Sequence, residues 1–153
     1  LDLLKIKNTG MIVTLDIGEN YDIHPSNKHD VGNRFALLAL NRTYGLKIVD
    51  SGPVLNELGF DGKYVNLYFK NTGAGLKITD YGKLCFEIAG EDKKYFKPVV
   101  NVYKNFLQLS SNYVQNPKFV RYAWSDTAKA TLFNIEGLPA SPFSSEYMEN
   151  INR

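Results

Sequence analysis

The sequence predicts an α+β chain in which a single strand–helix unit precedes an antiparallel β-sandwich. Residues 11–15 (MIVTL) form an apolar run without polar alternation, which is typical of a strand buried on both faces of a parallel sheet. Apolar residues at a helical period follow from Ser26 onward. Beyond Gly52, short segments rich in Val, Tyr, Phe and Leu recur between turn residues, and this pattern indicates antiparallel strands.

The predicted helix spans about residues 25–44. Pro25 suits the first turn of a helix, and Ser26 or Asn27 can accept hydrogen bonds from the free amide groups there. Gly45 is suited to the left-handed conformation that ends many helices. The apolar positions are Val31, Phe35, Leu38, Ala39 and the aliphatic part of Arg42. They recur at a helical period and therefore predict one apolar face.

The clearest strand candidate is residues 63–69, in which apolar and polar side chains alternate. Further candidates are residues 53–58, 85–89, 94–101, 106–110 and 119–124. Several short strands at this spacing are typical of an antiparallel sandwich. We place the domain boundary near residues 49–52. This gives residues 1–48 as the strand–helix unit, 49–143 as the sandwich and 144–153 as a polar, loosely held tail.

One strand and one helix cannot bury both of their faces. A parallel sheet needs neighbouring strands and helices on both sides, and residues 1–48 supply only one of each. The sequence therefore predicts that this unit is the last βα element of a larger α/β domain, and that the chain is a fragment.

Composition excludes several other classes of protein. The 18 basic residues are scattered and the net charge is +2, so no nucleic-acid-binding patch is indicated. No apolar run approaches the roughly 18 residues of a membrane span. The single Cys85 lies between Leu84 and Phe86 and is interpreted as a small core residue rather than a reactive thiol. Two histidines and one loop carboxylate are too few for a metal site, and no cofactor is expected.

Candidate catalytic residues lie in the loop between the predicted strand and helix. Histidine can act as a general base near neutral pH, and a carboxylate on its other ring nitrogen fixes its tautomer and charge. Asp22 and His24 supply both groups within this loop, with Asp16 and Glu19 as alternative acids. The alternative is a polar surface loop with a helix-capping residue. The chain contains no Gly-x-Ser-x-Gly elbow, so His24 would be a base without a nucleophile.

The sequence segments in and around this loop, together with three later segments, resemble a known family. They are residues 9–18 (TGMIVTLDIG), 20–28 (NYDIHPSNK) and 31–32 (VG), followed by 86–90 (FEIAG), 120–124 (VRYAW) and 134–143 (NIEGLPASPF). In this order they look like the carboxy-terminal part of the sialate O-acetylesterase family, which consists of SGNH-type serine hydrolases. The resemblance covers nearly the whole chain, but only the last part of such an enzyme.

The resemblance implies a Ser–His–Asp mechanism that removes acetyl groups from sugar hydroxyls. His24 matches the catalytic base, and Asp22 is the acid that we name with it. Many SGNH hydrolases place the acid three residues before the histidine, where Tyr21 stands, so Asp16 is kept as the alternative. The nucleophile would belong to an amino-terminal domain against which this chain packs, and the isolated chain is expected to have little or no activity. The implied substrate is an acetylated sugar or glycan, and the implied location is periplasmic or secreted.

The β-rich half suggests a second function, that of a non-catalytic glycan-binding or interdomain structural module. Aromatic side chains can pack on sugar rings, although alternation on strands explains most of them as core and cross-strand pairs. Tyr122 and Trp124 are predicted to share one face of a strand and to pack in the core. Residues 138–143 (LPASPF) are stiffened by two prolines and are predicted to pack along the catalytic domain or the interdomain seam.

Overall fold

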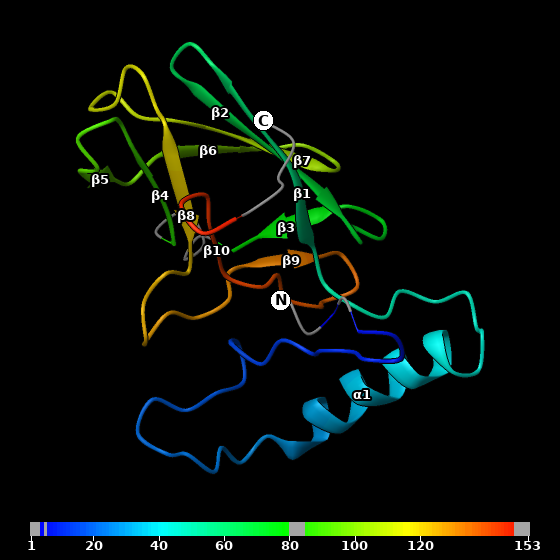
Figure 1. Ribbon diagram of the computed structural model, residues 1–153. Coiled ribbons are helices and arrows are strands. Elements are labelled where there is room, and N and C mark those ends of the chain that lie inside the picture. Colours follow the sequence, from blue (N-terminus) through cyan, green and yellow to red (C-terminus); the bar gives the residue numbers. More distant parts are fainter. Residues whose placement is uncertain (1–3, 5, 80–84, 149–153) are drawn as a thin grey trace.

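The structure, a computed structural model, describes residue 4 and residues 6–79 and 85–148. Its described part contains one helix and ten strands, and it is shown in Figure 1. The elements are α1 (Lys28–Arg42), β1 (Val54–Asp61), β2 (Tyr64–Lys70), β3 (Leu76–Ile78), β4 (Phe86–Ala89), β5 (Tyr95–Phe96), β6 (Val99–Val102), β7 (Phe106–Ser110), β8 (Phe119–Tyr122), β9 (Leu132–Asn134) and β10 (Phe143–Ser144). One helix with antiparallel sheets agrees with the predicted α+β class.

The strands form two four-stranded antiparallel sheets with a two-stranded sheet beside them. The orders are β1-β2-β7-β6, β10-β8-β4-β5 and β3-β9. Inward-facing side chains of the first two sheets belong to one hydrophobic core, as expected for a sandwich. Its fully buried members include Val65, Leu67, Leu107, Leu109, Phe86, Ile88, Val120 and Tyr122. Below the sandwich in Figure 1, α1 and the extended chain before it form a separate layer.

The predicted strand at residues 94–101 needs correction, and three short strands were not predicted. Residues 94–101 form two strands, because β5 pairs with β4 in one sheet whereas β6 pairs with β7 in the other. The chain crosses between the sheets at Lys97 and Pro98, and proline has no amide hydrogen to donate to a ladder. The short strands β3, β9 and β10 were not predicted, since two or three residues are too few to show alternation.

Tyr122 and Trp124 do not share one environment. Tyr122 is fully buried, and its hydroxyl oxygen accepts hydrogen bonds from the amides of Thr131 and Leu132, each at 2.8 Å. Trp124 is 44% exposed and stacks on Tyr147 with ring centroids 5.6 Å apart. The cause is Ala123, whose positive φ of 48° ends the alternation of β8. The predicted core role of Trp124 is therefore wrong.

The predicted strand at residues 11–15 is not formed. Residues 9–14 carry no regular secondary structure, and no strand of the described chain pairs with them. A strand requires a hydrogen-bonded partner, and the sandwich offers none on this side. The helix of the unit is present: the Asn27 side chain accepts a hydrogen bond from the amide of Asp30, and Gly45 follows the helix with a φ of 73°.

The beginning of the predicted tail is held firmly against the sandwich. The hydroxyl of Ser145 accepts a hydrogen bond from the amide of Val120 at 3.0 Å. The carboxylate of Glu146 accepts hydrogen bonds from Tyr95 at 2.5 Å and from Lys93 at 3.0 Å. The expectation of a loosely held tail is therefore wrong for residues 144–148, and residues 149–153 lie outside the described part.

The connection between α1 and the sandwich is fixed by a buried asparagine. The side-chain amide of Asn134 donates to the carbonyl of Ser51 at 3.2 Å and to that of Asn71 at 3.4 Å, and its oxygen accepts from the amide of Leu138 at 2.8 Å. Asn134 is fully buried, so these bonds satisfy an amide that would otherwise be costly to bury.

Within the described residues, the structure contains no helix with the length and apolar character needed to cross a membrane.

Candidate functional site

The candidate loop is closed by a carboxylate. Glu19 accepts hydrogen bonds through Oε1 from both the amide and the hydroxyl of Ser26, each at 2.8 Å. An isolated β-bridge between Glu19 and Asp22 tightens the turn. These bonds bring the two ends of the loop together, so residues 20–25 project from the layer that contains α1.

Asp22 and His24 lie together at the exposed end of this loop, but their contact runs through the backbone. Oδ1 of Asp22 accepts a hydrogen bond from the backbone amide of His24 at 2.7 Å. Among the described residues, the His24 ring forms no hydrogen bond with a carboxylate. Tyr21 is fully exposed and Ile23 is 91% exposed. The large side chains of Tyr21 and Ile23 and the neighbouring His24 are all exposed, so no described part of the chain covers this loop.

Asp16, the alternative acid, is committed to another partner. Its two carboxylate oxygens receive bonds from Arg34, at 2.7 Å to Oδ1 and 2.5 Å to Oδ2. Arg34 also donates to the carbonyl of Val13 at 2.5 Å. The two side chains are only 18% and 9% exposed, so this ion pair is largely removed from water. It fastens α1 to the extended chain that leads into the loop.

Arg34 was missed by the sequence analysis. It is the one buried residue of α1, and it lies three residues after Val31 and four before Leu38, on the apolar face of the helix. A lone arginine within an apolar helical face is a signal that could have been recognised, because a buried guanidinium needs a paired carboxylate.

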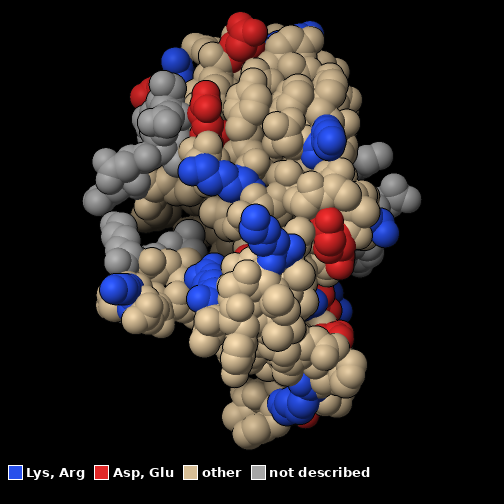
Figure 2. All heavy atoms as spheres, turned by 90° about the vertical axis from the view of Figure 1, so that its right-hand side faces the viewer, with Lys and Arg blue, Asp and Glu red and all other residues tan. Residues whose placement is uncertain are grey.

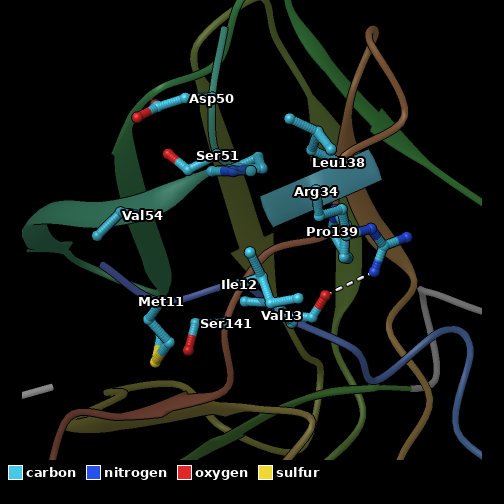
Figure 3. Close-up of a pocket in the computed structure, with 12 residues that line it drawn as sticks. Met11, Ile12, Val13, Arg34, Asp50, Ser51, Val54, Leu138, Pro139 and Ser141 are labelled. Carbon is cyan, nitrogen blue, oxygen red and sulfur yellow. Dashed lines mark hydrogen bonds between the residues drawn. The ribbon is translucent and has the colours of Figure 1, made fainter. Parts of the chain in front are cut away.

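The seam between the two layers contains a small cavity. Figure 3 shows Met11, Ile12 and Val13 near Ser141 on one side of it, and Leu138 and Pro139 on the other. Its volume is about 40 Å³, far below the roughly 300 Å³ of a typical ligand pocket, so the cavity is a packing junction and not a substrate site. The position of residues 138–141 agrees with the prediction that this stiff segment packs along the seam.

The charge of Glu19 is linked to the closed loop. Hydrogen bonds from the amide and hydroxyl of Ser26 hold the pKa of Glu19 below its ordinary value. A lowered pKa means that the closed loop favours the ionised carboxylate. This contribution is complete at neutral pH and is lost as the pH falls through the lowered pKa.

We therefore expect the Ser26 amide to lose its hydrogen bond in an acid transition centred below the ordinary pKa of a glutamate, about 4.3. The Ser26 amide resonance in an NMR titration from pH 7 to pH 2 reports this directly. Glu19→Gln should abolish the transition. Asp92→Asn, which alters another exposed loop carboxylate, should leave it unchanged. A Ser26 amide that titrates identically in Glu19→Gln would show that Glu19 does not close the loop.

Other candidate residues have ordinary surroundings. His29 is exposed on α1 and forms a hydrogen bond with the side chain of Asn33 at 3.1 Å. Cys85 is partly buried against the core, and its thiol donates to the carbonyl of Lys129 at 3.6 Å. In the described ranges, no group of three or more His, Cys, Asp or Glu residues could hold a metal ion.

Comparison with known proteins gives one informative result. No family model and no curated protein matches the sequence. Among solved structures, a carbohydrate acetylesterase from Xanthomonas citri matches with a TM-score of 0.88 and 36% sequence identity, over 96% of this chain and 34% of that chain. This chain thus has the fold of part of a carbohydrate acetylesterase.

The chain spans about one third of the length of that acetylesterase, 34%. The similarity agrees with the expectation that the chain resembles part of a carbohydrate esterase. It extends over nearly all of the chain, and so includes both the candidate loop and the sandwich.

Proposed function

We propose that this chain is the carboxy-terminal part of a carbohydrate O-acetylesterase of the sialate O-acetylesterase type, an SGNH serine hydrolase. The observation that carries the proposal is the structural match to a carbohydrate acetylesterase at 36% identity over 96% of the chain. The motif around His24 supports the more specific assignment, because its residues resemble the histidine block of that family. The substrate is an acetylated sugar or glycan, and the protein is periplasmic or secreted because such glycans lie outside the cell.

In this proposal His24 is the general base. It takes the proton of a serine that attacks the ester carbonyl, and later returns the proton to the departing group. Its exposed position at the loop end suits this role, since the ring is available to a nucleophile supplied by another part of the protein. The Glu19–Ser26 hydrogen bonds join the two ends of the loop, which supports a defined position for His24.

Asp22 is the acid that we assign to His24. Only its Oδ1 atom is used by the His24 amide, so Oδ2 is free among the described residues to accept a ring N–H after a side-chain rotation of His24. Asp16 is less suitable because Arg34 binds both of its oxygens. Ser26 is close to His24 in sequence, but its hydroxyl donates to Glu19 and closes the loop. In this proposal the nucleophile lies outside this chain.

The rest of the proposed catalytic domain would cover the extended chain before the loop and the helix. Residues 10–14 belong to no sheet of the described chain, and Phe35 and Leu40 are exposed on α1. A neighbouring parallel strand would extend residues 10–14 into a sheet, and its helix would bury these side chains. The exposed Tyr21 and Ile23 would then lie at the edge of the active site, next to the substrate or the second domain.

The proposal is tested by comparing this chain with the longer polypeptide that contains it. Acetate release from an acetylated oligosaccharide is measured for both, together with labelling by a serine-directed fluorophosphonate. We expect the longer protein to hydrolyse the ester and to be labelled before Leu1, and the 153-residue chain to do neither. Turnover or labelling of the isolated chain at a similar rate would place the nucleophile inside it and overturn the proposal.

A further inference from the structure

The outer face of the sheet β1-β2-β7-β6 carries side chains in rows that cross the strands. Tyr68 pairs with Phe106 in the β2–β7 register, and the amide of Tyr103 bonds back to the carbonyl of Phe106 at 3.0 Å. These three residues form an aromatic row. Two positions along each strand, Asn66 pairs with Gln108, and Gln108 pairs with Asn101. These three residues form an amide row parallel to the first.

The aromatic row is held rigid by ring stacking. The rings of Tyr103 and Phe106 are parallel within 1°, with centroids 4.2 Å apart, and Tyr68 stacks on the other side of Phe106 at 5.3 Å. Tyr103 ends the row, and Phe106 is its only ring contact among the described residues. Its side chain is 45% exposed, so an aromatic surface is presented to solvent in a fixed orientation.

The amide row supplies hydrogen-bonding groups of both kinds. Gln108 donates through Nε2 to Oδ1 of Asn66 at 3.2 Å, which orients both side chains. Each amide side chain has two donor hydrogens and an acceptor oxygen, so this one bond leaves donors and acceptors available on the row. Asn101 extends the row to the exposed edge strand β6. Two residues along a strand correspond to about 7 Å, so one sugar unit can reach both rows.

Charged residues are confined to the margin of this face. Glu57 and Asp61 pair with Tyr68 and Tyr64 from the outer strand β1, and Lys70 ends β2. The outward positions of β2, β7 and β6 between these charges are aromatic, amide, hydroxyl or aliphatic. Figure 2 shows the side of the molecule on which β1 lies, and its upper part carries a broad area without charged side chains. The surface therefore suits a partner that is polar and uncharged.

We propose that the outer face of β2, β7 and β6 binds an uncharged polysaccharide. The aromatic row contacts the apolar C–H face of a sugar ring, and the amide row exchanges hydrogen bonds with its hydroxyl groups. A charged polymer is disfavoured because the rows contain no side chain of opposite charge to replace the water that it would lose. This binding is separate from ester hydrolysis, since it requires neither His24 nor a nucleophile.

The test uses the 153-residue chain and affinity electrophoresis in gels that contain one polysaccharide each. Hydroxyethylcellulose, galactomannan and glucomannan are the uncharged probes, and polygalacturonate is the charged one. We expect retardation by at least one uncharged probe and none by polygalacturonate. Absence of retardation by all three uncharged polymers, or stronger retardation by polygalacturonate, overturns the proposal.

Two variants locate the surface. Tyr103→Ala removes an exposed ring beyond the end of β6, and Asn101→Asp places a charge in the amide row, so both should fold normally. Each should weaken binding about tenfold. Trp124→Ala and Tyr113→Ala remove exposed rings that belong to neither row and should bind as the unchanged chain does. Loss of binding in Trp124→Ala but not in Tyr103→Ala would place the glycan elsewhere. A dimer that dissociates in Tyr103→Ala, without glycan binding, would show that a second copy covers this face.

Discussion

Replacing His24 with alanine is expected to lower acetyl-ester hydrolysis by the longer protein about a thousandfold or more. In the proposed mechanism His24 is the general base and also protonates the leaving group, and general acid–base catalysis typically contributes about 10²–10⁴-fold to the rate. The His24 ring has no described hydrogen-bond partner and lies on an exposed loop, so its removal should not change the thermal unfolding midpoint. Acetate release at saturating substrate and differential scanning calorimetry measure the two effects.

The chain provides a matched control for this variant. His29 is the other histidine, it is also exposed, and it contacts only its helix neighbours in the described structure. His29→Ala should retain full turnover. If His24→Ala retained it as well, His24 would have no role in the chemistry, and the similarity to an acetylesterase would then refer to the fold alone.

Replacing Arg34 with alanine is expected to detach α1 from the extended chain before the loop. The substitution leaves the Asp16 carboxylate largely buried without its partner, and breaking a buried ion pair in this way costs about 3–5 kcal/mol. No strand of the described chain packs extensively against α1, so the loss should appear as local opening. Hydrogen exchange should accelerate in α1 while the amides of β2 and β7 keep their protection.

Two comparisons separate the buried pair from a general effect of removing an arginine. Arg42→Ala removes a partly exposed ion pair with Asp50 and a hydrogen bond to the carbonyl of Thr9, and it should cost about 1–2 kcal/mol, less than Arg34→Ala. Combining Arg34→Met with Asp16→Leu removes both charges and should recover part of the lost protection. Unchanged exchange of α1 in Arg34→Ala would mean that other contacts hold the helix.

The parts of the fold that were predicted are those in which local pattern and tertiary packing agree. The alternation of residues 63–69 matches β2, whose buried residues Val65 and Leu67 face the core. Asn27 and Gly45 have the expected roles at the ends of α1. In each case the signal lies within a few residues, so the sequence alone is sufficient.

The parts that were not predicted depend on distant or conformational information. The run at residues 11–15 has the composition of a strand, but pairing requires a partner that the described chain does not supply. Trp124 continues the alternation in sequence, yet the left-handed conformation of Ala123 turns it outward. The candidate loop was located from its residue types, whereas the commitment of Asp16 to Arg34 required the folded geometry.

The buried amide of Asn134 restricts the movement of the connection between α1 and the sandwich. It fastens the carbonyl of Ser51, in the only covalent connection between α1 and the sandwich, to the segment that leads into Leu138. The neighbouring Gly52 lies so close to the Pro139 carbonyl that a side chain there would collide with it. The connection is thus clamped from two sides and cannot act as a free hinge. These contacts therefore limit how far the end of α1 that is joined to the sandwich can move relative to it.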